Sequence, residues 1–212
     1  LMELFVLGVD RYTEDDVKGA ARALTGYQVV NYEGSLTFNP KRHDPNPIAI
    51  LGATQPFTGE QLSDFLVARE DCATFIAERL WYRFISSTET MPASFGAKKA
   101  FATRDISSAV KAMVQDPAVG DAKNDLVKSP VEWFIAACRA LELTPSNLKT
   151  PTQLINYLNQ LNQVPFNPPN VGGWPAGEAW LSSAAVQYRI AFATWLIKQS
   201  SLRGLLEIPV AN

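Results

Sequence analysis

The stretch SPVEWFIAACRAL, residues 129–141, shows most clearly how this chain folds. Ser129 and Glu132 have the spacing of a capping box, in which each of two side chains accepts a hydrogen bond from a free backbone donor at a helix start. Pro130 takes the first helical position, where its missing N–H costs no hydrogen bond. The stretch therefore predicts an amphipathic helix, with an apolar face that needs a packing partner and consists of Val131, Phe134, Ile135, Cys138 and Leu141.

Similar helix starts recur along the chain. Capping-box spacing is also present at Thr58 with Gln61 and at Thr150 with Gln153. Thr13 precedes an acidic first turn, and acidic residues at that end favour the helix dipole. Apolar residues repeat with helical spacing after each of these starts, so helices dominate the prediction.

A short region departs from this pattern. Tyr27–Asn31 and Leu36–Asn39 have the character of two strands joined by a turn, and Ile48–Leu51 could add a third. The last long helix is expected from about Gly177 to Gln199. We therefore predict a mainly α fold, a multi-helix orthogonal array with a small β-hairpin near residues 27–51.

Length and composition narrow the class of protein. A chain of 212 residues, with 47% apolar and 19% charged residues, is typical of one globular domain over residues 1–212. A net charge of −2 argues against a broad basic surface, so no nucleic-acid partner is expected. No apolar run reaches the ~18 residues of a membrane span. Two distant cysteines, Cys72 and Cys138, are expected to be free and to pack as small apolar side chains.

The first residues suggest a longer parent chain. Leu1–Gly8 is an apolar helical segment that ends at a glycine and has no capping residue before it. We expect this chain to be the C-terminal part of a longer protein, with the preceding part packed on residues 1–10. Any export signal would lie in that preceding part. We expect the protein in the periplasm or outside the cell in preference to the cytoplasm.

The single histidine is one candidate for a site. His43 is followed by Asp44, and such a pair could perform acid–base chemistry or bind a metal. A turn is the more economical interpretation, because Asp before Pro commonly fixes a loop and a lone histidine lacks the further ligands of a zinc site. We therefore expect no metal and no cofactor.

A loop rich in proline, glycine and tryptophan is the second candidate. Residues 165–180 read PFNPPNVGGWPAGEAW and contain Trp174 and Trp180. The indole rings could form a stacking platform for a sugar or a peptide, or they could fill the core of a rigid connector. The connector is the commoner outcome for large aromatic side chains.

Two charged residues beside apolar helices complete the candidates. Glu3 and Arg189 could line a polar pocket, although ion pairs that orient helices are commoner. The sequence contains no Gly-x-Ser-x-Gly elbow, P-loop, His-Glu-x-x-His or Cys-x-x-Cys motif. No complete catalytic template is therefore present.

Several motifs, in the same order along the chain, resemble the DUF1800 family of large bacterial proteins, whose function is unassigned. They are Leu1–Asp10, Tyr12–Val17, Ala21–Gly26, His43–Asp44, Ile50–Gly52, Lys128–Glu132 and Pro168–Pro175. The resemblance spans nearly the whole chain and implies a bacterial origin and the C-terminal portion of a longer protein. The family usually has Trp after Thr-Gly, where this chain has Tyr27, and no activity comes with the resemblance.

Three functions stay open at this point. The leading hypothesis is a binding or scaffold module for a polymer or a partner protein, because no catalytic template is complete and the tryptophan loop is rigid. The rival is a hydrolase-like enzyme that uses His43 and Asp44. The third is a structural piece of a larger assembly. Whether the chain is an enzyme is left open by its sequence.

Overall fold

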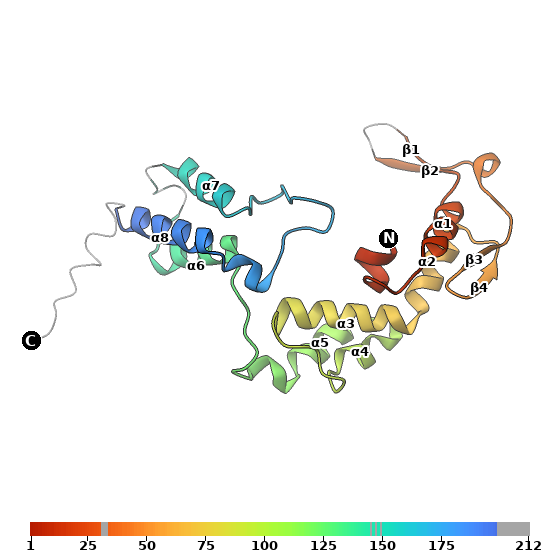
Figure 1. The fold of residues 1–212 in the computed structure, drawn as a ribbon, viewed down its shortest axis with the longest axis horizontal. Coiled ribbons are helices and arrows are strands. Elements are labelled where there is room, and N and C mark those ends of the chain that lie inside the picture. The colour runs from red at the N-terminus through yellow and green to blue at the C-terminus, as the bar shows by residue number, and fades with distance from the viewer. Residues whose placement is uncertain (31–33, 145, 147, 149, 199–212) are drawn as a thin grey trace, which may run out of the picture. The chain divides into compact units, whose positions relative to one another are not determined.

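The computed structural model describes residues 1–30, 34–144, 146, 148 and 150–198, and it is mainly α-helical, as predicted (Figure 1). The chain divides into two compact units. The first unit contains residues 1–81 and 91–119, and the second contains residues 82–90 and the chain from residue 120 onward. A single domain would mean that both units unfold together. The division into compact units does not test this, so the single domain stays a prediction.

The first unit combines short helices with two hairpins. Its elements, in chain order, are η1 (Met2–Leu7), α1 (Glu14–Ala23), β1 (Tyr27–Val30), β2 (Ser35–Phe38), η2 (Pro40–Arg42), β3 (Ile48–Ile50), β4 (Ala53–Gln55), α2 (Gly59–Ala68), α3 (Glu70–Phe84), α4 (Ala97–Ala100), η3 (Phe101–Thr103), α5 (Ile106–Val114) and η4 (Pro117–Gly120). The last residues of α3 and of η4 belong to the second unit.

The predicted hairpin is confirmed, and a second one accompanies it. β1 pairs antiparallel with β2, with Tyr27 opposite Phe38; residues 31–33 of the predicted turn lie outside the described residues. β3 pairs antiparallel with β4, a strand that the sequence did not predict. Leu51 and Gly52 form this tight turn with φ of 49° and 84°. Positive φ at both positions matches the right-handed twist of a two-residue hairpin.

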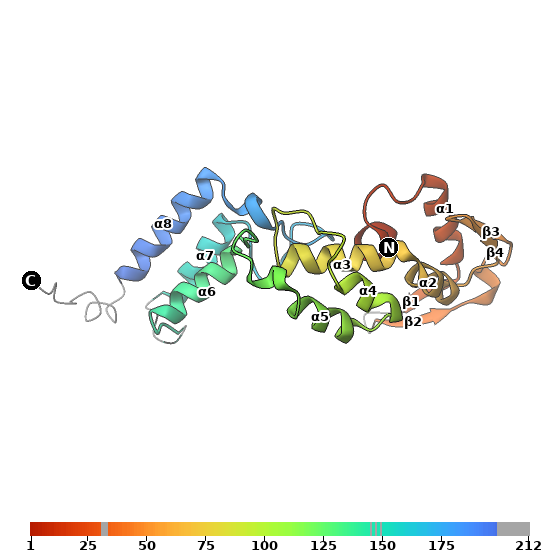
Figure 2. The same ribbon diagram turned by 90° about the horizontal axis from the view of Figure 1, so that it is seen from below.

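The core of the first unit lies between η1, α1, α2 and the second hairpin. Its fully buried side chains include Leu7, Ile50, Phe57 and Leu62. Gly19 allows α1 to approach β3, because a Cβ at this position would lie 2.8 Å from the carbonyl oxygen of Ala49. Figure 2 shows α1 beside β3 and β4, in agreement with Figure 1. Cys72 is buried and free, as expected, and burial raises the pKa of its thiol.

The second unit is built on three helices that lie side by side in both views (Figures 1 and 2). They are α6 (Pro130–Ala140), α7 (Pro151–Gln160) and α8 (Ser183–Ile197), with the short η6 (Gly177–Trp180) before α8. Their apolar faces meet in one core, in which the rings of Phe134 and Phe192 stack with centroids 3.7 Å apart. Cys138 is half-buried at this core and free.

The structure confirms most predicted helix starts and corrects two of them. Thr58 with Gln61 and Ser129 with Glu132 form complete capping boxes. Thr150 precedes α7 but its side chain makes no capping bond, so that prediction was wrong. The last helix begins at Ser183 instead of Gly177, because Ser182 accepts a hydrogen bond from the backbone N–H of Ala185 and so caps the helix at that point.

Candidate functional site

The second unit contains a cavity of about 1070 Å³. Three segments line it: the end of α3 with the residues after it, the start of α6 with the residues before it, and the loop between α7 and α8. Its volume slightly exceeds the ~300–1,000 Å³ of typical small-molecule pockets. We call it the aromatic cavity, because its wall contains Tyr82, Phe84, Phe166, Trp174 and Trp180.

The predicted tryptophan loop supplies much of this wall. Trp180 is 4% exposed, so one of the two predicted roles, a ring that fills the core, holds for this residue. Trp174 is half-buried and also lines the cavity. Phe166 is 100% exposed and has a φ of 64°, a conformation that is strained for a side chain with a Cβ. The loop therefore combines one buried anchor with aromatic faces that a ligand could reach.

Two polar atoms in this wall have no hydrogen-bond partner. The indole N–H of Trp174 and the hydroxyl of Ser87 are both buried and unpaired within the part of the chain that the structure describes. A buried polar group without a partner costs about 1–3 kcal/mol, so each such group calls for a partner such as an ordered water or a ligand. A ligand with hydroxyl groups could pair with both.

Gln163 connects the loop to α6. Its side-chain oxygen accepts a hydrogen bond of 2.8 Å from the backbone N–H of Val131 in the first turn of that helix. This bond satisfies one of the backbone donors that a helix start leaves free. The side-chain amide N–H groups of Gln163 have no partner among the described residues, and Gln163 lines the cavity.

Gly177 holds the loop against the residues that follow α3. Its φ is 64°, and a Cβ here would lie 2.8 Å from Cβ of Ser87 and 2.9 Å from its hydroxyl oxygen. Gly173 has a φ of 86°, but no described atom lies within 4 Å of its Cβ position. The two glycines can therefore be compared directly, because both have a positive φ and only Gly177 packs closely against another residue.

Gly177→Ala is expected to lower the melting temperature more than Gly173→Ala. Both variants strain the backbone, because alanine disfavours a positive φ. The expected loss is larger than the ~1 kcal/mol that a glycine-to-alanine substitution can gain at a compatible position. Only Gly177→Ala also forces the loop away from Ser87. Thermal denaturation of the two variants measures the difference, and equal losses would contradict the close contact.

Arg189 contacts one residue of the cavity wall. Its guanidinium donates a hydrogen bond of 3.1 Å to the carbonyl oxygen of Lys128 and lies 5.5 Å from the ring centroid of Trp133. Burial lowers the pKa of Arg189, and its Nε is buried without a partner among the described residues. Arg189 does not itself line the cavity, but it bonds the backbone of Lys128, which does.

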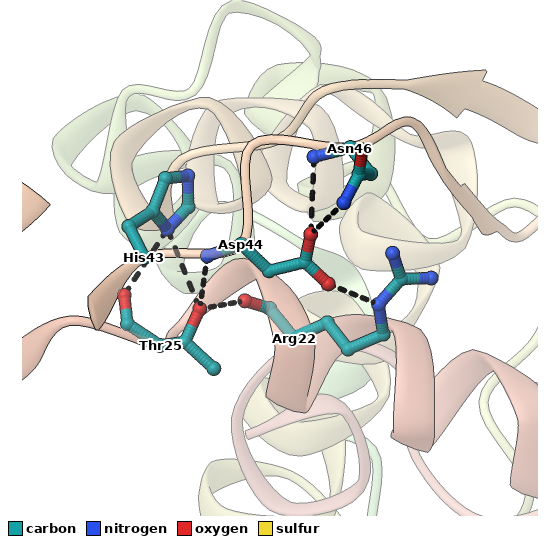
Figure 3. A network of polar contacts seen from close by, with 5 residues as sticks. All are labelled: Arg22, Thr25, His43, Asp44 and Asn46. Carbon is teal, nitrogen blue, oxygen red and sulfur yellow. Dashed lines mark hydrogen bonds and ion pairs between the residues drawn. The ribbon is translucent and has the colours of Figure 1, made fainter. Parts of the chain in front are cut away.

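His43 and Asp44 lie in the first unit, and their side chains do not bond each other. Asp44 accepts hydrogen bonds from Nε of Arg22 at 2.8 Å, and from the backbone and side-chain nitrogens of Asn46 at 3.1 and 2.8 Å (Figure 3). His43 turns toward Thr25, whose carbonyl oxygen lies 3.1 Å from Nδ1. A carbonyl oxygen only accepts, so Nδ1 carries the proton.

This arrangement fits the predicted turn. The backbone N–H of Asp44 donates to the hydroxyl of Thr25, and the His43 ring packs at 5.4 Å from the ring of Phe38. Gly26 leaves room for this packing, since a Cβ there would lie 3.2 Å from Cβ of His43. Asp44 therefore fixes the loop to the end of α1 and does not orient His43 for catalysis.

Asp44→Asn is expected to lower the melting temperature near neutral pH and to have little effect in strong acid. The hydrogen bond from Arg22, followed by those from Asn46, lowers the pKa of Asp44 from 3.8 to about 2. The charged carboxylate therefore stabilises the fold fully above pH 3.8, and this stabilisation is lost as the pH falls through about 2. Calorimetry of both proteins across this range checks it; a difference that does not depend on pH would contradict the ion pair.

Glu3 contacts Tyr12 near the start of the chain. The hydroxyl of Tyr12 donates a hydrogen bond of 2.6 Å to the Glu3 carboxylate, which raises the pKa of Tyr12. Both residues line a groove of about 410 Å³ between η1 and α1, whose lining also includes the exposed apolar side chains of Leu1 and Leu4. The expectation that a preceding segment packs on residues 1–10 stays a prediction, and these apolar side chains are the surface that it would cover.

The candidates thus fall into three separate places. Trp174 and Trp180 share the aromatic cavity, Arg189 bonds the backbone of Lys128 in its wall, and His43, Asp44 and Glu3 lie in the first unit. Sequence reasoning missed Tyr82, Phe84 and Phe166 as members of the cavity. One further signal points to the predicted loop: residues 150–177 contain no charged side chain, although many of them are exposed.

Within the described ranges, no group of three or more His, Cys, Asp or Glu side chains could hold a metal ion. No helix in that part of the chain has the length and apolar character needed to cross a bilayer.

The fold and the cavity define a class: a mainly α-helical protein with an aromatic cavity in one of two compact units. The chain belongs to the DUF1800 family, because the model of this family, described as "Protein of unknown function (DUF1800)", matches residues 1–209. No curated protein and no solved structure matches it.

Proposed function

We propose that the second unit is a binding module for a polysaccharide, which occupies the aromatic cavity. The observation that carries this proposal is the pairing of flat aromatic faces with unpaired polar atoms in one wall. Trp174 and Phe166 offer apolar faces, and the indole N–H, the Ser87 hydroxyl and the Gln163 amide offer hydrogen bonds. A sugar ring has both an apolar face and hydroxyl groups that donate and accept.

The hydrolase hypothesis has no such support. The Asp44 carboxylate is occupied by Arg22 and Asn46, and His43 is bonded to a backbone carbonyl. A general base must be oriented by a partner and must reach its substrate. The Thr25 carbonyl orients the His43 ring, but no carboxylate among the described residues bonds to that ring, because Asp44 is engaged by Arg22 and Asn46, so binding is favoured over hydrolysis. We place this binding outside the cytoplasm, where structural polysaccharides are found.

A screen on immobilised polysaccharides tests the proposal. The protein is expected to bind at least one polysaccharide, and Trp174→Ala is expected to abolish the signal. Phe5→Ala is the matched control, because Phe5 is an aromatic side chain that is 59% exposed in the first unit and lies outside the cavity wall. Binding that survives Trp174→Ala, or no binding to any polysaccharide, would overturn the proposal.

A further inference from the structure

We infer that the polysaccharide bound in the aromatic cavity carries carboxylate groups, and that Lys128 and Arg83 recognise them. This inference rests on the proposed function and names the class of its ligand, an acidic polysaccharide built from uronic-acid units. The ligand would therefore carry negative charge, in addition to the apolar ring faces and hydroxyl groups that the proposed function requires.

The charges of the cavity wall carry this inference. Two cations, Arg83 and Lys128, line the cavity, against one carboxylate, Glu132. Neither cation has a carboxylate partner among the described residues. Glu132 is already engaged, because its Oε2 accepts a hydrogen bond of 2.8 Å from the backbone N–H of Ser129. The wall therefore presents an excess of positive charge in a protein whose net charge is −2.

The placement of both cations agrees with a recognition role. The guanidinium of Arg83 lies 5.8 Å from the ring centroid of Tyr82, an aromatic residue of the same wall. The backbone of Lys128 is held by Arg189, while its ammonium group stays exposed. A cation that packs beside aromatic faces is suited to a ligand that alternates apolar ring faces with carboxylates.

The residues of the loop between α7 and α8 that line the cavity contribute no competing charge, since Glu178, the charged residue of this loop, is not among them. Residues 150–177 are uncharged, so the part of the wall that this loop supplies is neutral. Both cations belong to the other two segments: Arg83 lies next to Tyr82 at the end of α3, and Lys128 precedes α6. A nucleic acid would also present rings and negative charge. The carboxylated polysaccharide is favoured, because two cations of the described residues line the cavity and a run of phosphates needs several.

The test compares each acidic polysaccharide with its carboxyl-reduced counterpart, in which every uronic acid has become the neutral sugar. Binding is measured by titration calorimetry at low and at moderate salt, with single-stranded DNA as a further ligand. The variants are Lys128→Ala, Arg83→Ala and the control Lys111→Ala, an exposed lysine of α5 outside the cavity. Circular dichroism verifies that each variant folds.

The acidic form is expected to bind more tightly than the reduced form, and salt is expected to weaken only the acidic form. Each cavity variant should lose about fivefold to tenfold in affinity for the acidic form and little for the reduced form. Lys111→Ala should change neither. Equal binding of both forms would overturn the carboxylate inference and leave the proposed function standing.

Two other results have separate meanings. If neither form of any pair binds while the screen finds a neutral polysaccharide that does, the inference is overturned and the proposed function stands; if no polysaccharide binds at all, both fail. If single-stranded DNA binds as tightly as the best acidic polysaccharide and loses affinity in the same variants, the ligand is a nucleic acid and the inference is overturned.

Arg189 supplies an independent check as a positioning residue. If it acts by holding Lys128, Arg189→Met should reduce the preference for the acidic form. The same substitution should cause no further loss of preference when Lys128→Ala is already present. If Arg189→Met reduces the preference for the acidic form equally with and without Lys128→Ala, the positioning role is contradicted.

Discussion

Trp174→Ala is expected to weaken polysaccharide binding by roughly 30-fold or more, equivalent to about 2 kcal/mol, as for a central aromatic anchor of an interface. The substitution removes an aromatic face and the unpaired indole N–H from the same wall. Trp174 is the better residue to test, because Trp180 is 4% exposed and its removal would damage the fold.

Trp174→Phe separates the two contributions. It keeps an aromatic face and removes only the N–H, so a loss of about fivefold is expected, equivalent to the ~1 kcal/mol of one hydrogen bond. Calorimetric titration of both variants measures the two values. An unchanged dissociation constant for Trp174→Ala would show that the ligand does not use this face.

Phe192→Ala is expected to destabilise the second unit by about 3–5 kcal/mol, the usual cost of removing a buried aromatic ring. Phe192 is 0% exposed and stacks on Phe134, so the deletion leaves a cavity between α6 and α8. For a chain of this length, the loss corresponds to a fall of roughly 6–20 °C in melting temperature.

Ile135→Ala is the matched control for this prediction. Ile135 lies on α6 next to Phe134 and is 52% exposed, so its truncation is expected to change the free energy of unfolding by less than about 0.5 kcal/mol. Thermal unfolding of both variants gives the comparison. Similar losses in the two variants would contradict the core described for the second unit.

The helices could be predicted because their signals are local. A capping residue and the residue three positions later determine a helix start together, as Ser129 with Glu132 does for α6. The same pattern failed at Thr150, whose side chain forms no capping bond. The final helix was placed too early, because η6 continues the helical spacing until Ser182 begins the true helix.

The aromatic cavity could not be predicted in the same way, because its wall joins residues that are distant in the sequence. Tyr82 and Trp174 line one cavity although about 90 residues separate them, and no local pattern indicates that contact. The opposite error is possible for neighbours: His43 and Asp44 are adjacent, yet one side chain turns to Thr25 and the other to Arg22. Two adjacent residues, His43 and Asp44, therefore suggested a joint site that they do not form. The distant residues of the aromatic cavity showed no sign in the sequence that they share one wall.

The central claim is that the aromatic cavity of the second unit is a ligand site, and nuclear magnetic resonance of the indole N–H groups tests it most directly. The chain has five tryptophans, and Trp174→Phe assigns the signal of Trp174. On titration with the polysaccharide selected by the screen, the Trp174 signal is expected to shift, while that of Trp81, buried in the first unit, stays in place. A bound polysaccharide that leaves the Trp174 signal unmoved would contradict the claim.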